Sequence, residues 1–458
     1  MRRRLFVLCL SGALLQLGVA ASANAAPDPF YPGCDQGRAG QQRVMAADPE
    51  SLPRILSTAK AGDEIQLASG AYGAVKLTGD NAAFVTVTNR PGQTPRLASL
   101  EISGGHWRVS GLTIVGFAPP ALGWDGWQRH DALVKVVQAK NVLLSGNVVA
   151  STEDAPSWEQ EKHGVTQSDA LSDGIDVLDS TCVSVSDNRI KNVFNGLVAV
   201  SDQSGDQGRR ILITGNQIDD FAGDGVDHSV SEALIQRNLI TDAHNVCDSL
   251  CIHQDGIQGW NSVGKPKVVS RDIVIDGNTI IRVARPNLPR PSSALQGITI
   301  FDGNWSNLQV TNNIVVVNVW HGITLFGPKS AYIVNNTVVG DSANRTWIMV
   351  APQKEAFGGG APDHVIVANN IAMDFRFAST GLISLVGIAP KDNYTTFNPR
   401  DTFRTFDPKA ARFDLHIRHP HGELEGGRMT PPAERDIDGT PRSARTELGA
   451  YASSSMSQ

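Results

Sequence analysis

Four aspartates in the middle of the sequence have the spacing that acid–base or metal chemistry needs. Asp176, Asp224, Asp227 and Asp255 each lie one residue before or two residues after a glycine. Paired carboxyl groups can act as general acid and base, and several together supply the oxygen ligands that Ca²⁺ prefers. We therefore predict Asp224, Asp227 and Asp255 as catalytic residues. We predict all four as metal ligands, with Ca²⁺ as the ion and no organic cofactor.

Basic side chains flank these aspartates and are the candidates for a catalytic base. His253 lies just before the last of the four and is the best single candidate for a general base. Lys162 and His163 lie in an insertion, where the alternative interpretation is a solvated loop. Arg282 and Arg285 stand in a later loop, where their cations would neutralise a substrate carboxylate. We predict Arg282 as catalytic and Arg285 as substrate-binding.

The elements that must position these residues are short and repeated. A tetrad of a polar residue, Gly, an aliphatic residue and usually a second polar residue occurs six times, beginning at Asp173, Asn195, Asp224, Asp255, Gln296 and His321. Each is in step with a phrase of Asn, one residue and an aliphatic, and Asn216 to Asn238 is 22 residues whereas Asn147 to Asn188 is 41. Units this short hold strands and no helix, and stacked short strands form a solenoid. We predict a right-handed parallel β-helix.

Strand alternation indicates which side chains of each coil point outward. The aliphatic residue after Gly faces the core, so Gly and the residue two beyond it are predicted to face solvent. The second of these columns contains Asp176, Val198, Asp227, Gln258, Thr299 and Thr324, and the column four beyond Gly ends in Trp260, Phe301 and Phe326. Three stacked aromatics suit the apolar faces of sugar rings, although covering loops are the alternative. With walls from the insertions 150–171, 241–254 and 282–295, the pattern predicts a groove for an extended polymer that binds at Gln258, Trp260, Phe301, Phe326, Asp176 and His321.

The polar residues that precede the glycines have two interpretations. They form a ladder that satisfies backbone amides, or they are functional. For Asn195 and Gln296 we favour the ladder, whereas stacked carboxylates are costly, so for Asp173, Asp224 and Asp255 we favour function. His228 occupies a position that is small or apolar in the other tetrads, and we interpret it as a core histidine.

The N-terminus has the pattern of a secretory signal. Residues 1–25 contain three arginines, an apolar run and a small-residue cleavage site, and no other run is long enough to span a bilayer. Removal leaves 37 basic against 46 acidic residues, a formal charge of −9 that argues against nucleic-acid binding. We expect a periplasmic or secreted monomer. Cys247 and Cys251 are predicted to close a small disulfide loop.

Both ends of the mature sequence resemble a known class of protein. Residues 61–73, which contain Ala61-Gly62-Asp63-Glu64-Ile65, and residues 436–451 are similar to the first and closing segments of secreted bacterial β-helix proteins. Among these are the chondroitinase B-like polysaccharide lyases of the pectate-lyase-like superfamily, whose catalytic motifs are not matched here. The resemblance implies an N-terminal cap at 26–60, the β-helix at 61–400 and a C-terminal cap segment at 401–458.

Three function classes remain open at this point. The resemblance favours β-elimination at a uronic acid of an acidic polysaccharide. Hydrolysis by paired aspartates is the alternative, because residues 171–176 look like a polygalacturonase motif, although Val198 stands where those enzymes carry an aspartate pair. The third class is a non-catalytic polysaccharide-binding or export protein, or a uronate epimerase.

Overall fold

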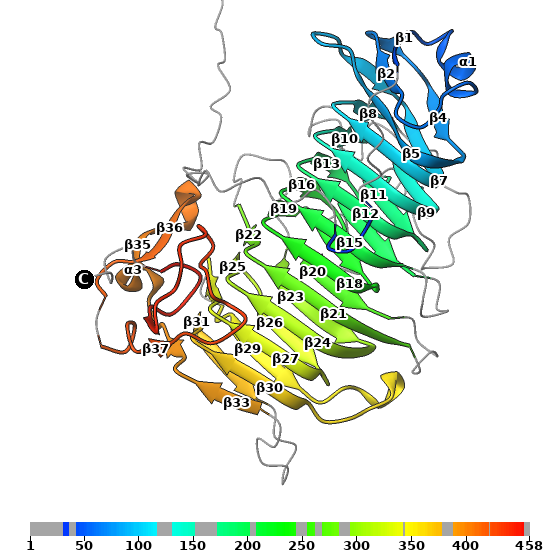
Figure 1. Cartoon of the computed structure of the whole chain (residues 1–458). Helices are drawn as coiled ribbons and strands as arrows, with labels where there is room; N and C mark the ends of the chain where they lie inside the picture. The colour runs from blue at the N-terminus through cyan, green and yellow to red at the C-terminus, as the bar shows by residue number, and fades with distance from the viewer. Residues whose placement is uncertain are drawn as a thin grey trace, which may run out of the picture.

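Short parallel strands stacked into coils form almost the whole of the molecule. The structure is a computed structural model, and it describes residues 31–35, 43–116, 131–151, 172–201, 208–243, 254–261, 268–283, 294–341, 344–377, 388–420 and 422–452. Each coil of the regular part contributes three strands, and each strand pairs in parallel with its counterparts in the neighbouring coils. The coils lie side by side along one axis, with the strand Val44–Ala47 at one end (Figure 1). The chain is a right-handed parallel β-helix, as predicted.

The strands fall into three groups by their place in the coil. In the N-terminal coils these are β1 (Val44–Ala47), β2 (Glu64–Leu67), β3 (Gly70–Ala71), β4 (Ala74–Leu77), β5 (Asp80–Asn89), β6 (Pro95–Leu97), β7 (Ser99–Ser110), β8 (Thr113–Val115), β9 (Val134–Ser145) and β10 (Val148–Ala150). First strands of the later coils are β11 (Ile175–Leu178), β14 (Leu197–Val200), β17 (Val226–His228), β20 (Gln254–Trp260), β23 (Leu295–Asp302), β26 (His321–Phe326), β29 (Trp347–Ala351) and β32 (Asp374–Phe377). Second strands are β12 (Thr181–Ser186), β15 (Arg209–Thr214), β18 (Ser231–Gln236), β21 (Val269–Asp276), β24 (Asn304–Thr311), β27 (Lys329–Val334), β30 (Asp363–Ala368) and β33 (Ile388–Lys391). Third strands are β13 (Arg189–Val193), β16 (Gln217–Phe221), β19 (Leu239–Ala243), β22 (Thr279–Ile281), β25 (Ile314–Val317), β28 (Thr337–Gly340), β31 (Ile371–Ala372) and β34 (Tyr394–Thr395).

A continuous column of aliphatic side chains fills the inside of the coils. The residues that follow the tetrad glycines are in register and almost fully buried: Ile175, Leu197, Val226, Ile257, Ile298 and Ile323. Burying a side chain of this size contributes about 1.5–3 kcal/mol. Because every coil supplies one, the core is a stack that lengthens with each repeat.

The repeated asparagines form an unbroken ladder at the turn between the second and third strands. The side-chain oxygen of each accepts the backbone N–H and the side-chain amide of the asparagine one coil earlier, through Asn147, Asn188, Asn216, Asn238, Asn278, Asn313, Asn336, Asn370 and Asn393. The residue before each has a left-handed backbone and is Gly, Asp or Asn at every coil except Arg237. The second sequence phrase is therefore a structural element.

The tetrad glycines face the inside of the corner, so the prediction that they leave a bare solvent-facing floor is wrong. A Cβ on Gly196 would lie 2.4 Å from the carbonyl oxygen of Gly225 and 2.5 Å from Cγ2 of Ile218. A Cβ on Gly174 or Gly297 would likewise meet the carbonyl oxygen of the tetrad glycine in the next coil and an aliphatic side chain of its own coil. The chain bends before the first strand, and this bend takes glycine out of the alternation. Glycine is required there for packing.

The C-terminal segment packs against the side of the solenoid. It contains α3 (Pro399–Thr402), the hairpin β35 (Phe403–Asp407) and β36 (Arg412–Ile417), and the pair β37 (Gly427–Arg428) and β38 (Arg445–Thr446), all beside the third strands (Figure 1). Its apolar side chains cover the outward residues Ile281, Ile314, Val316, Val339 and Ile371. The expectation that this segment closes the end of the solenoid therefore needs correction, because the third strands have a second apolar face that must be covered.

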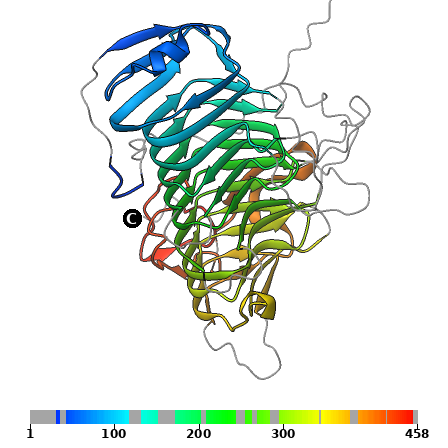
Figure 2. The same cartoon turned by 90° about the vertical axis from the view of Figure 1, so that its right-hand side faces the viewer.

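The N-terminal end carries the short helix α1 (Leu52–Leu56), at the end of the stack (Figure 2). The parallel ladder already begins with β1, which lies within the range predicted as a cap and pairs with β2. Helices η3 (Glu355–Phe357) and η4 (Pro408–Ala410) are single turns. In the described ranges, no helix is long and apolar enough to cross a membrane.

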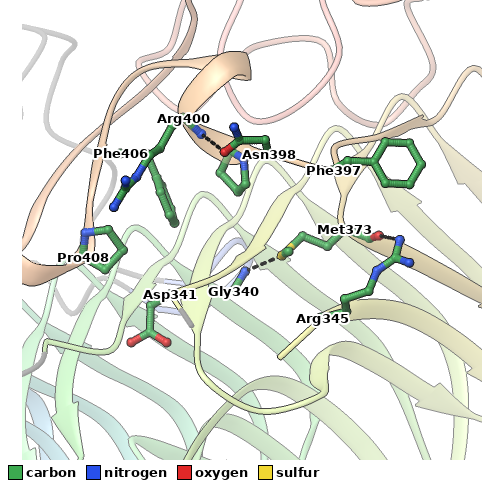
Figure 3. Close-up of a pocket in the computed structure, with 10 residues that line it drawn as sticks. Gly340, Asp341, Arg345, Met373, Phe397, Asn398, Arg400, Phe406 and Pro408 are labelled. Carbon is green, nitrogen blue, oxygen red and sulfur yellow. Dashed lines mark hydrogen bonds between the residues drawn. The ribbon is translucent and has the colours of Figure 1, made fainter. Parts of the chain in front are cut away.

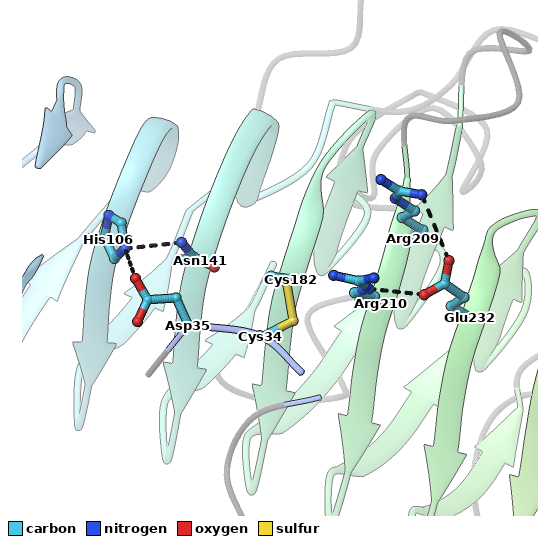
Figure 4. Close-up of a disulfide and its surroundings, with 8 residues drawn as sticks. All are labelled: Cys34, Asp35, His106, Asn141, Cys182, Arg209, Arg210 and Glu232. Atoms are coloured by element: carbon cyan, nitrogen blue, oxygen red, sulfur yellow. Dashed lines mark hydrogen bonds and ion pairs between the residues drawn. A yellow bond between two sulfur atoms is a disulfide. The ribbon is translucent and has the colours of Figure 1, made fainter. Parts of the chain in front are cut away.

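Residues 31–35 run along the outside of the coils and are tied to them by a disulfide that the sequence did not predict. Cys34 is bonded to Cys182, which lies 148 residues later in the chain (Figure 4). Asp35 contacts the His106 ring at 3.3 Å, two coils toward the N-terminal end. At the other end of the segment, burial and then the carboxylate of Glu232 raise the pKa of Tyr31. The segment of residues 31–35 therefore contacts several successive coils.

Removing this disulfide is expected to destabilise the protein. A crosslink that closes a loop of this length removes unfolded-state entropy worth about 3–5 kcal/mol in the chain-entropy treatment. We expect the double variant Cys34→Ser, Cys182→Ser to unfold at lower urea concentration, as monitored by tryptophan fluorescence. An unchanged midpoint would show that the coils alone determine the stability.

Candidate active site

The outward column of the first strands exists as predicted, and it carries the acidic side chains. Cα partners across neighbouring coils run from Asp176 to Val198, Asp227, Gln258 and Thr299. Its exposure was predicted wrongly, however. Asp176 is 2% exposed and Asp227 is 8% exposed, and the threonine of the column is fully buried. The carboxylates are therefore shielded from bulk water, which strengthens every electrostatic interaction among them.

A polar ladder precedes these strands, and it accounts for part of the acidic residues. Oδ1 of Asp173 accepts the backbone N–H of Asn195, whose side chain accepts the N–H of Asp224. Oδ1 of Asp224 in turn accepts the N–H of Asp255 at 2.8 Å. The ladder is confirmed for Asn195, whereas the preference for function over the ladder at Asp173 and Asp224 needs correction. Orphan amides at the bend need an acceptor, which a carboxylate supplies as well as an amide.

Asp255 ends this run of ladder contacts and has a different environment. Its Oδ2 accepts a hydrogen bond from Nε2 of Gln258 at 2.8 Å, and the residue is fully buried. The pKa of Asp255 is raised to about 8, chiefly by burial and also by the carboxylate of Asp227, against the opposing hydrogen bonds of Gln258 and Thr299. A carboxyl group with this pKa is protonated at neutral pH.

Asp224 and Asp227 complete a cluster of acids around Asp255. Burial, and then the carboxylates of Asp255 and Asp227, raise the pKa of Asp224 well above its ordinary value. Asp227 lies at the edge of the cluster, where Nε1 of Trp260 donates a hydrogen bond to its Oδ2 at 2.8 Å. We call Asp224, Asp227 and Asp255 the acid cluster. Because the three cannot all ionise in a buried site, the cluster holds protons at neutral pH.

A lysine that sequence reasoning missed stands at the N-terminal end of the same column. Lys135 on β9 is the Cα partner of Asp176, and its Nζ lies 2.6 Å from Oδ1 of Asp131. Its coil has Leu133 where the later coils have the tetrad glycine, so the tetrad motif does not mark this coil. Lys135 can be predicted from the sequence by continuing the register of the outward positions one coil toward the N-terminus.

The predicted aromatic platform is formed by two of its three residues. The rings of Phe301 and Phe326 are 5.0 Å apart, and that of His321 packs edge-on against Phe301 at 5.0 Å. Trp260 does not belong to this stack, because a bulge after Gly259 pairs it with Asp302. It packs toward the acid cluster instead.

His321 and Arg282 both lie away from the acid cluster, and each contacts a different set of residues. His321, two coils further along, is hydrogen-bonded through Nδ1 to Oγ1 of Thr324 at 2.9 Å and receives Nε1–H of Trp347 at 3.3 Å. Arg282 follows a third strand, and its Nη1 lies 2.5 Å from Oδ2 of Asp341. The structure therefore gives Arg282 a partner outside the acid cluster, and its catalytic role stays a prediction.

His228 is a core residue, as predicted. Its side chain is fully buried and packs edge-on against the ring of Trp305 at 5.7 Å. Burial lowers the pKa of His228 to about 4, so the ring is neutral in the folded protein.

Several predicted residues lie outside the described part of the chain. These are the predicted bases Lys162, His163 and His253, the predicted substrate ligand Arg285, and the predicted disulfide partners Cys247 and Cys251. The metal prediction also lacks support from the residues that the structure does describe, since no group of three or more His, Cys, Asp or Glu side chains among them is arranged to hold an ion. Calcium at Asp176, Asp224, Asp227 and Asp255 stays a prediction that an EDTA-treated assay tests.

The acid cluster and His228 predict that the protein loses stability as the pH rises above about 6.5. Asp255 in the folded protein keeps a proton up to about pH 8 that the unfolded chain releases near pH 4, so stability falls as pH rises through this window. His228 acts in the opposite direction below pH 6.5, because only the unfolded chain takes up its proton there. Above about pH 6.5 the fall from each acid is at most about 1.4 kcal/mol per pH unit. Urea midpoints between pH 6.5 and 8 should decrease in the native protein and decrease less steeply in Asp255→Asn, where Asp224 remains.

The comparison with family models matches the coils that carry this site. Residues 157–338 match the model described as "Right handed beta helix region". With the parallel coils of the structure, this match shows a right-handed parallel β-helix. No curated protein matches the chain.

Solved structures with a similar arrangement of coils share little sequence with this chain. The pectate lyase Pel9A has a TM-score of 0.43 and 11% identity, covering 91% of this chain and 97% of its own. A mannuronic acid specific family 6 lyase from human gut microbiota has a TM-score of 0.42 and 14% identity, covering 77% and 87%. The mannuronan C-5 epimerase AlgE6 A-module of Azotobacter vinelandii has a TM-score of 0.39 and 12% identity, covering 76% and 86%. At these values the likeness assigns no activity to this chain.

Proposed function

We propose that this protein is an enzyme that cleaves an acidic polysaccharide, by β-elimination at a uronic acid residue, with the acid cluster at its centre. The observation that supports this proposal is the raised pKa of Asp224 and Asp255, which keeps protons inside a buried site at neutral pH. A protonated carboxyl donates a hydrogen bond to an anion, so the cluster is able to accept a uronate carboxylate that an ionised cluster would repel.

β-Elimination requires three events at one sugar. The carboxylate charge is neutralised, the proton on the neighbouring carbon passes to a base, and the oxygen of the glycosidic bond leaves with a proton as a carbon–carbon double bond forms. Asp227 belongs to the outward column and is bonded to the partly exposed Trp260, so it is the group that would reach the substrate. Asp224 and Asp255 hold the proton that neutralises the carboxylate, and His253 is the predicted base.

The outward column gives a polymer further contacts on both sides of the acid cluster. Gln258 and Trp260 are partly exposed beside Asp227, and Lys135 is partly exposed three coils away. Coils are about 4.8 Å apart, so Lys135 lies roughly 14 Å along the axis and would pair with a carboxylate of a different sugar. These contacts favour an extended chain over a single sugar.

One assay separates this function from its rivals. Purified protein is incubated with pectate, alginate, chondroitin and a neutral glucan, and ultraviolet absorbance and reducing ends are recorded together. Elimination gives both signals in proportion on an acidic polymer. Reducing ends without new absorbance contradict elimination, and the absence of both excludes cleavage and leaves a binder or an epimerase.

Hydrolysis is the second candidate. It is favoured by the proximity of Asp224 and Asp255, because the carboxylate of Asp255 raises the pKa of Asp224. These residues occupy adjacent coils, and a spacing near 5 Å between two carboxyl groups is that of retaining glycosidases. One carboxyl would remain protonated as the acid while its neighbour attacks as the nucleophile. The expected product then keeps the configuration of the bond that was cut, which NMR of the first products would show.

A further inference from the structure

A pocket separate from the acid cluster lies between the solenoid and the C-terminal segment. It has a volume of about 410 Å³ and is formed by the ends of β28 and β31 on one side and by α3, β35 and η4 on the other (Figure 3). This volume is within the range of small-molecule sites. Its coil is the third after that of Asp255, which places it roughly 14 Å along the axis.

The walls of this pocket combine two arginines with aromatic side chains. Arg345 and Arg400 are exposed at its rim, and Phe397, which is 80% exposed, has the guanidinium carbon of Arg345 5.6 Å from its ring centre. Phe406 contributes a second ring from β35. A planar apolar wall beside two guanidinium groups suits a ring that carries a carboxylate.

Asp341 adds a hydrogen-bond acceptor at the base of the pocket. Its side chain is 2% exposed, and only its Oδ2 is paired, with Arg282. Oδ1 is buried and has no hydrogen-bond partner among the residues described. A buried carboxylate oxygen without a partner is destabilising, and a ligand that donates a hydroxyl to it would relieve this cost.

We infer that this pocket binds one uronate residue of the substrate chain, which rests on the proposed function. The sugar carboxylate pairs with Arg400 and Arg345, a hydroxyl donates to Oδ1 of Asp341, and the apolar face of the ring lies on Phe397. Inorganic anions fit less well, because they have no apolar face and no hydroxyl for Asp341. The pocket thereby selects a carboxylated sugar over both a neutral sugar and a simple anion.

Met373 provides a local probe of occupancy, because it lines the pocket and its Sδ accepts the N–H of Gly340 at 3.1 Å. Protein with ¹³C-methyl methionine is titrated with sodium galacturonate, sodium glucuronate, glucose and sodium sulfate at matched ionic strength. The Met373 signal, assigned with Met373→Leu, should shift saturably with a uronate and not with glucose or sulfate. The Met45 signal at the far end of the solenoid is the internal control.

Variants then test the contacts. Arg400→Ala should weaken uronate binding at the Met373 signal at least tenfold, whereas Arg54→Ala, an exposed arginine on α1, should leave it unchanged. No shift with either uronate, an equal response to glucose or sulfate, or full affinity in Arg400→Ala would overturn the inference. Cleavage is measured independently, so a uronate response without cleavage refutes only the proposed function. Cleavage without that response refutes only the pocket.

Discussion

Asp227→Asn is expected to lower kcat on the cleaved polymer at least 100-fold while leaving the fold intact. A positioned acid or base contributes about 10²–10⁴ to the rate, and Asp227 is the member of the acid cluster in the outward column, beside the partly exposed Trp260. Asparagine keeps the shape and still accepts the hydrogen bond from Nε1 of Trp260, so the packing of that ring should persist. The measurement is the initial rate of product formation at saturating polymer.

Two comparisons make this result specific. Asp363→Asn changes an exposed carboxylate on β30 and should keep native activity. Asp255→Asn removes the group with a pKa of about 8, so its main effect should be a change in the pH–rate profile on the alkaline side. Native rates in Asp227→Asn at every pH would exclude the acid cluster from the reaction.

The coils could be predicted from the sequence because the spacing of the repeats determines which residues align in neighbouring coils. The aliphatic residue after each tetrad glycine and the ladder asparagines occupy the same place in every coil, so their spacing alone aligned Asp176, Asp227 and Gln258 in one column. The same register identified His228 as a core residue. These predictions needed only local periodicity, and the structure confirms them.

Features that depend on departures from the repeat were not predictable in the same way. The bulge after Gly259 moves Trp260 out of the aromatic column, and no residue type marks it in the sequence. The bend before the first strand turns the glycines inward, although simple alternation places them outside. The burial of Asp176 and Asp227 likewise depends on what covers a column, which its own pattern does not contain.

Contacts between residues far apart in the sequence were the second kind of feature that could not be predicted. Cys34 and Cys182 are brought together by a segment that runs along the coils, and cysteine spacing does not determine such a pairing. The C-terminal segment joins Arg442 to Asn312, 130 residues apart, because the third strands have an apolar outer face. Reading that outer face as a surface that needs a cover would have predicted this packing.

Asn238→Ala is expected to cause the largest loss of stability, because it interrupts the ladder in the middle of the solenoid. The Asn238 side-chain oxygen accepts the backbone and side-chain N–H groups of Asn216, and its amide donates to the oxygens of Ile213 and Asn278. Each buried group left without a partner costs about 1–3 kcal/mol, so a loss of at least about 4 kcal/mol is expected in urea unfolding. Asn393→Ala removes fewer bonds at the partly buried last position of the ladder and should cost about half as much. A loss below about 1 kcal/mol in Asn238→Ala would mean that backbone pairing alone sets the register, and that the repeated asparagine is dispensable for the fold.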